Sequence, residues 1–201
     1  MHALDPDHVV AVSMLSNQKP SFKHSLFHCM HWALGHGSVL LLAGVLLFGL
    51  GVMIPELLQK SAEASVGVVL IVLGLLCFKQ FKNEKLTATA CSQNNTRQAP
   101  GTRKPVFIGA LHGLAGSVPA LALIPAVASG ELLVALVYLL LFSLGVLLSM
   151  LAFGFGFGAC QRYLSQRYRQ VFQYSRRALA TVSIVLGGFW LAQVLPAAFE
   201  F

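Results

Sequence analysis

The residues with the clearest capacity for chemistry lie at the start of the chain. Seven positions hold two imidazoles and two carboxylates, with an apolar run directly behind them: His2, Asp5, Asp7 and His8. An ionisable side chain costs about 2.5–3.5 kcal/mol at the centre of a membrane-spanning helix, so four of them beside an apolar run need a functional reason. Imidazole nitrogen and carboxylate oxygen together form a ligand set for Ni²⁺, Co²⁺ or Zn²⁺. The cluster therefore predicts a site for a divalent transition metal.

Two further histidines stand inside apolar segments and are candidate ligands of the same site. His36 lies between two glycines, which permit close approach of either a neighbouring helix or an ion. His112 lies between Gly109 and Gly113, a GxxxG pair that favours tight helix packing. For both histidines the alternative is a packing role without a metal. His24, His28 and His31 share one helical face at i, i+4 and i+7, and we interpret the first two as interfacial polar residues.

The first helix is expected to start at Pro6. Proline fits the first turn of a helix, where its missing N–H costs nothing, and Asp5 before it is a suitable N-cap. A break at this point would let His2 fold back toward Asp7 and His8. The alternative is a polar N-terminal tail outside the bilayer.

The composition indicates an integral membrane protein. Of 201 residues, 56% are hydrophobic and 10% are charged, whereas soluble domains carry about 25% charged residues. The net charge of +7 does not indicate nucleic-acid binding, because the basic residues lie in connections between apolar spans. The four cysteines are widely separated and form no CxxC pair, so neither a disulfide framework nor a dithiol redox motif is expected.

Six transmembrane helices are expected. Long apolar stretches cover residues 31–54, 64–78, 106–128, 132–158 and 178–195, near or above the ~20 residues that cross a bilayer. Residues 3–16 would supply the sixth helix. They are too short and polar to span alone, so they form either a half-helix or, as we prefer, the rest of a helix that begins earlier.

The distribution of basic residues predicts the topology. All of the 14 lysines and arginines except Lys60 fall in the connections after the first, third and fifth spans. The positive-inside rule then places these connections in the cytoplasm and both termini outside, in a cytoplasmic (inner) membrane. Residues 162–177 are interpreted either as a basic helix lying on the cytoplasmic leaflet or as a solvated loop.

The chain divides into two similar halves. Residues 1–82 form the first three-helix membrane half, 83–104 a polar cytoplasmic linker, and 105–201 the second half. His2-Ala3-Leu4 matches His112-Gly113-Leu114. Because each half has three spans, the halves have opposite orientations, as in transporters built from inverted repeats. The fold class is thus all-α and polytopic, with about six helices in two inverted repeats.

Three motifs resemble those of a known family. His2-x4-Asp7-His8 resembles the H-x4-D-H signature of the nickel/cobalt transporter (NiCoT/NicO) superfamily, and Leu34-Gly35-His36 resembles its second histidine motif. Residues 112–117, HGLAGS, are similar to the shorter six-helix branch of UreH-type urease accessory membrane proteins. The resemblance implies that His2, Asp7 and His8 are metal ligands or selectivity determinants, with His36 as a second contributor. Classical members have eight spans and more helix before the signature.

We interpret the chain as a transporter, and not an enzyme, that moves Ni²⁺ or Co²⁺ and supplies urease or another nickel enzyme. The expected metal residues are His2, Asp7, His8, His36 and His112, with no organic cofactor. Expected partners are the divalent ion, the bilayer, metalloenzyme maturation proteins and a second copy of the chain in a homo-oligomer. Alternatives are a transporter of an anion or small organic solute, a membrane metalloenzyme or electron-transfer subunit, and an accessory protein that presents metal without transporting it.

Overall fold

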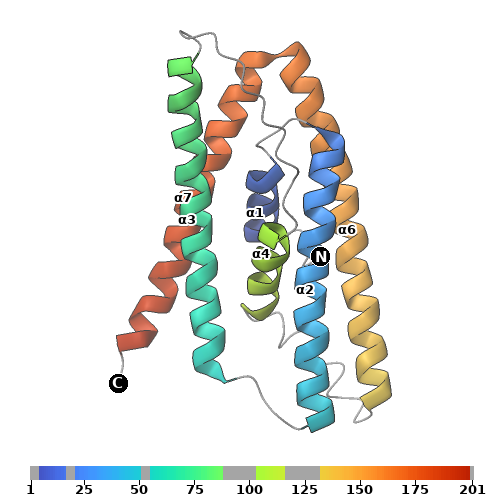
Figure 1. Ribbon diagram of the computed structural model, residues 1–201. Coiled ribbons are helices and arrows are strands. Elements are labelled where there is room, and N and C mark those ends of the chain that lie inside the picture. The colour runs from blue at the N-terminus through green and yellow to red at the C-terminus, as the bar shows by residue number, and fades with distance from the viewer. Residues whose placement is uncertain (1–4, 17–20, 51–54, 88–102, 116–131, 200–201) are drawn as a thin grey trace.

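The computed structural model describes residues 5–16, 21–50, 55–87, 103–115 and 132–199. Within these ranges the chain forms six α-helices (Figure 1): α1 (Pro6–Ser16), α2 (Phe22–Leu50), α3 (Glu56–Thr87), α4 (Arg103–Leu114), α6 (Leu132–Arg167) and α7 (Arg169–Phe199). The expected all-α, polytopic fold is confirmed. Helix α3 continues five residues beyond the expected end of the first half, into the segment assigned to the linker.

Four of the helices are long and apolar enough to cross a membrane: α2, α3, α6 and α7. Helices α1 and α4 have 11 and 12 residues, about 17 Å at 1.5 Å per residue, which is near half of the hydrocarbon thickness. They lie between the long helices, in the interior of the bundle (Figure 1). The expected span over residues 106–128 is therefore helical to Leu114, and its remainder from 116 lies outside the described residues.

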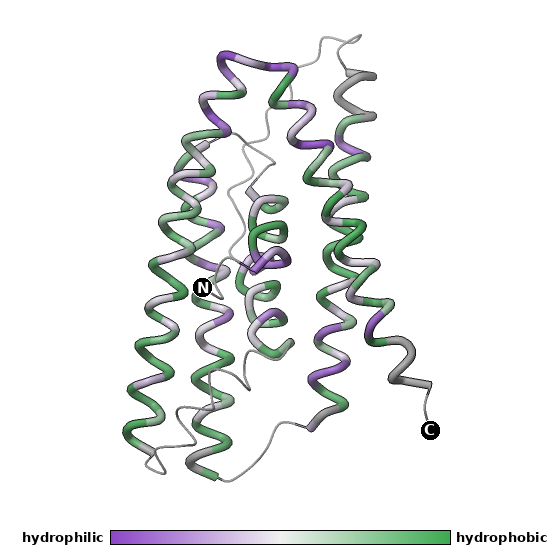
Figure 2. Tube along the Cα trace, turned by 180° about the vertical axis from the view of Figure 1, so that it is seen from behind, coloured by the Kyte–Doolittle hydropathy of each residue, from purple (hydrophilic) through white to green (hydrophobic). Residues whose placement is uncertain are grey.

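The outer faces of the long helices are apolar. Large hydrophobic side chains on them stay exposed, among them Leu57, Leu133, Leu148 and Val185 at 65–76%. Figure 2 shows hydrophobic positions along most of the long helices, with hydrophilic positions at the turn between α6 and α7 and on the short helices inside the bundle. Apolar surface on this scale favours contact with lipid, so these faces are the ones that meet the bilayer.

The long helices pack in antiparallel pairs that relate the two halves. Along α2 and α6, Gly44 faces Leu139 and Gly154 faces Cys29, so one chain direction opposes the other. Along α3 and α7, Gly67 faces Gly187, and Ser183 Oγ donates a hydrogen bond of 2.7 Å to the Leu70 carbonyl. Among the described residues, each half has one short helix followed by two long ones, and corresponding long helices run in opposite directions. This antiparallel relation agrees with the inverted repeat expected from the sequence.

The connection between α6 and α7 differs from both interpretations of residues 162–177. Helix α6 continues to Arg167 and α7 begins at Arg169, with Tyr168 alone between them. Tyr168 N–H still donates to the Leu164 carbonyl at 2.8 Å, so the backbone hydrogen bonds of the helix continue into the turn. The 36 residues of α6 give about 54 Å of helix, so the basic ends project past the hydrocarbon as extensions of the spans.

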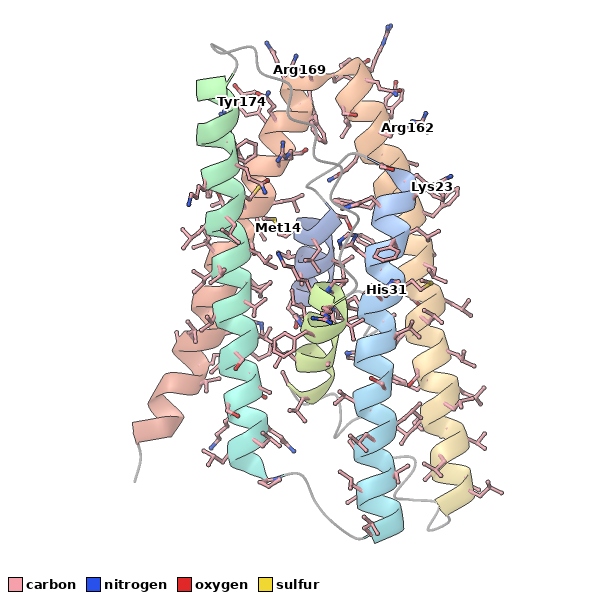
Figure 3. All side chains as sticks on the ribbon, in the orientation of Figure 1. Met14, Lys23, His31, Arg162, Arg169 and Tyr174 are labelled. Atoms are coloured by element: carbon pink, nitrogen blue, oxygen red, sulfur yellow. The ribbon has the colours of Figure 1, made fainter. Side chains whose placement is uncertain are left out.

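Basic residues gather at one end of the bundle. Figure 3 places Lys23 of α2, Arg162 of α6 and Arg169 of α7 toward the same end, and the C-terminal end of α7 lies at the other (Figure 1). For these three residues the segregation seen along the sequence is also a segregation in space.

Helix α4 packs backbone to backbone against α2. A Cβ added at Gly109 would meet the Trp32 carbonyl oxygen, and one at Gly113 would lie 2.7 Å from the His36 carbonyl oxygen. Gly35 of α2 faces Val106 of α4 in the same way, so the glycines around His36 and His112 serve helix approach. The GxxxG expectation is confirmed. This contact sets how near the two histidines can come to each other.

Gly109→Ala is expected to destabilise the protein by at least about 2 kcal/mol, since overpacking costs about 1–3 kcal/mol and the obstacle here is backbone. The matched control is Gly145→Ala in α6, where an added Cβ meets nothing within 4 Å and alanine is the better helix former. Thermal unfolding in detergent measures both. Equal melting temperatures for the two variants would contradict this packing.

Candidate metal site

The N-terminus of α1 brings the acidic and imidazole groups together. The helix begins at Pro6, and the Asp5 carbonyl accepts its first backbone hydrogen bond, from Val9 N–H at 3.0 Å. The expected start and N-cap position are confirmed. His2 lies outside the described residues, so its predicted return toward Asp7 stays a prediction.

Asp5, Asp7 and His8 form a group that could hold a metal ion. One ligand atom from each lies within 4.8 Å of the others. His8 Nδ1 lies 3.2 Å from Asp7 Oδ1, and His8 is 3% exposed. Asp5 belongs to the N-terminal cluster seen along the sequence but was not among the expected metal residues, whereas the structure places its carboxylate in the group. The Asp-x-Asp spacing across the first helical turn was the signal for this.

His36 and His112 both lie against His8. The His8 ring centroid is 5.4 Å from that of His36 and 5.3 Å from that of His112. Both of these histidines are buried. Three imidazoles from α1, α2 and α4 thus meet at the centre of the bundle, as the sequence predicted for this trio. We call Asp5, Asp7, His8, His36 and His112 the central cluster.

Trp32 packs the imidazoles into place. Its ring stacks on His36 at 5.1 Å and 14° and meets the His8 ring edge-on at 4.8 Å. It is fully buried and lies one helical turn before His36 on α2. Sequence reasoning missed this residue because a tryptophan in an apolar span carries no ligand atom. Its i+4 spacing to His36 was the available signal.

The orientation of His112 resembles that of a metal-ligating histidine. Its Nδ1 lies 2.8 Å from the Ile108 carbonyl oxygen, and because a carbonyl can only accept, Nδ1 carries the proton. The ligand atom is then Nε2. Ligating histidines commonly donate their second ring N–H to a carbonyl or carboxylate in this way.

The charge of the central cluster suits a cation. With neutral imidazoles, its two carboxylates give it a negative charge inside a bundle of apolar helices. A bound divalent ion would compensate that charge. Three nitrogen donors and two carboxylates also match the ligand types of nickel, cobalt and zinc.

No cysteine of the described residues belongs to the metal-capable group. Cys29 and Cys77 are buried free thiols and Cys160 is an exposed one, while Cys91 lies outside the described residues. Cys29 packs against Gly154, so it fills the contact between α2 and α6.

A family model described as "Cytochrome C biogenesis protein transmembrane region" matches residues 9–190. The chain belongs to this family. The match contains His36 and His112 and begins one residue after His8, so the acidic group at the head of α1 lies before the matched region. No solved structure matches the chain.

A curated relative is the urease accessory protein UreH of Bacillus sp. (strain TB-90). It is 31% identical over 158 residues, which cover 76% of this chain and 69% of that protein. The chain is thus a UreH-like membrane protein, as the resemblance of HGLAGS implied. Neither the description of the family nor the name of the relative is that of an enzyme.

Proposed function

We propose that the protein carries a divalent transition metal, Ni²⁺ or Co²⁺, across the cytoplasmic membrane. The observation that carries this proposal is the central cluster, which combines half-buried carboxylates and buried imidazoles among four candidate spans. Ionisable side chains inside membrane-spanning bundles are rare and costly, and they mark ion pathways and other functional sites. We assign the binding of the ion to Asp7 and His8, with Asp5, His36 and His112 completing the site, and His2 joining it from the preceding residues.

Two short helices that meet between paired long helices also favour transport. Ligand sites in inverted-repeat transporters lie where discontinuous helices meet near the midplane. The two halves, 1–82 and 105–201, would then move against each other around the ion. The membrane potential supplies about 2.3 kcal/mol per charge per 100 mV, twice that for a divalent ion moving inward.

We further propose that the basic end faces the cytoplasm, by the positive-inside rule. The ion delivered there would serve a urease or another nickel enzyme, since the UreH relative is a urease accessory protein. Maturation proteins of such an enzyme are the expected receivers.

Flux of radioactive Ni²⁺ into proteoliposomes tests the function. Uptake above that of empty vesicles, competed by Co²⁺ and reduced by Asp7→Asn, is expected. Zn²⁺ as a second competitor ranks the ion preference. Absence of flux with wild-type protein that still binds Ni²⁺ would instead support the second candidate, an accessory protein that presents metal without transport, a role suggested by the relative's name.

Nickel binding is expected to weaken as the pH falls. Only the neutral imidazole ligates, so protons compete with the ion for His8, His36 and His112, and affinity is lost toward low pH. Titration calorimetry at several pH values measures this. Constant affinity between about pH 5 and pH 8 would show that imidazoles do not hold the ion.

A further inference from the structure

A second group of histidines lies on α2, apart from the central cluster. His24 and His28 have ring centroids 4.2 Å apart. Their i, i+4 spacing is the one by which two histidines of a helix hold a single zinc ion in H-E-x-x-H sites. His28 is buried and His24 is half-buried, so the protein covers most of the pair while part of His24 stays accessible.

The His28 ring is held for ligation in the same way as His112. Its Nδ1 lies 2.8 Å from the His24 carbonyl oxygen, so this nitrogen carries the proton and Nε2 is the ligand atom. His31 has the same type of bond, to the Phe27 carbonyl at 2.8 Å, but its ring packs on Phe27 at 4.0 Å. His31 is therefore a histidine of the same helix whose ring packs on the aromatic ring of Phe27.

The pair lies between the basic end of the bundle and the central cluster. His24, His28, Trp32 and His36 occupy successive turns of α2, and eight residues of helix between His28 and His36 span about 12 Å. Figure 3 places Lys23 at the end of this helix and His31 further into the bundle. Trp32, whose indole nitrogen is a donor only, separates the two groups, so an ion at one cannot share ligands with the other.

The two groups are expected to differ in their affinity for a cation. The central cluster contains carboxylates, while the pair offers neutral imidazoles next to the positive charge of Lys23. A cation is held less tightly where no anionic ligand compensates its charge. The outer pair is thus suited to hold an ion briefly.

We propose that His24 and His28 form a second, weaker binding site for the transported metal, through which the ion passes between the central cluster and the basic end. This inference rests on the proposed function and adds to it a second binding site for the same ion. Its ligand atoms are Nε2 of His28 and a ring nitrogen of His24.

Equilibrium dialysis of the full-length protein in detergent against radioactive Ni²⁺ tests the second site. Wild-type protein is expected to show a tight and a weak class of bound ion. The double variant His24→Gln/His28→Gln should lose the weak class and keep the tight one, whose retention also shows that the variant is folded. Asp7→Asn should do the reverse. His31→Gln is the matched control and should keep both classes.

Ni²⁺ flux through the same variants in proteoliposomes shows whether the second site lies on the transport path or only binds the ion. His24→Gln/His28→Gln should lower the maximal Ni²⁺ flux severalfold while the affinity of the tight class is unchanged, and His31→Gln should leave the flux unchanged.

Weak binding that survives in the double variant, or an equal loss in His31→Gln, would overturn the second site alone. A wild-type protein without a tight class would instead contradict the proposed function itself.

Discussion

Asp7→Asn is expected to lower the affinity for Ni²⁺ by at least about 100-fold, because even groups that only orient ligands change metal affinity by 10–100-fold. Asparagine keeps the size of the side chain and removes its charge, so the His8 imidazole 3.2 Å away loses its anionic partner. Titration calorimetry measures the affinity, and proteoliposome flux should fall to the level of empty vesicles.

Glu63→Gln on α3 is the matched control for the charge change. Glu63 is half-buried and is not one of the residues of the metal-capable group. Its substitution should leave Ni²⁺ affinity within experimental error. Equal losses for both variants would mean that the general negative charge of the protein, and not the central cluster, governs binding.

Trp32→Ala is expected to have the largest effect on stability. The indole is fully buried and contacts the rings of His8, His36 and His112. Removal of a buried tryptophan costs about 3–5 kcal/mol, and here it also releases the imidazoles from their positions. Thermal unfolding should show the loss, and Ni²⁺ affinity should fall although no ligand atom is removed.

Phe189→Ala on α7 is the control for aromatic truncation, because that side chain is 56% exposed on the lipid-facing surface. Its melting temperature in detergent should change little. Trp32→Phe should restore part of both stability and affinity by keeping a ring against His36. If Trp32→Ala left Ni²⁺ affinity intact, the tryptophan would have no part in arranging the site.

Much of the fold was predictable from the sequence, because few backbone structures other than long apolar helices can cross a bilayer. The long apolar runs and the segregation of basic residues predicted the all-helical fold, and the Asp5-Pro6 pair predicted the start of α1. The secondary structure of residues 162–177 could not be predicted in this way. The basic residues suggested an interfacial helix or a loop. In the structure α6 instead continues to Arg167 and α7 begins at Arg169, so the two helices meet at a turn at Tyr168.

The candidate site was predictable in part. His36 and His112 stood out as ionisable groups in apolar spans, and the glycines beside them predicted the close α2–α4 contact that brings both to His8. Two residues of the site, Asp5 and Trp32, were not among the expected metal residues, although Asp5 was counted in the N-terminal cluster. The carboxylate of Asp5 joins the group because the first helical turn places it next to Asp7. Trp32 was missed because packing around a site leaves no chemical signature in a sequence.

The most direct measurement is anomalous diffraction at the nickel edge from crystals of the Ni²⁺-bound protein. The central claim is that Asp7 and His8, with His36 and His112 around them, hold the transported ion. The expected result is an anomalous peak in contact with the Asp7 carboxylate and the His8 ring, lost in Asp7→Asn crystals. Nickel bound in full occupancy elsewhere in the protein, with the central cluster empty, would contradict the claim.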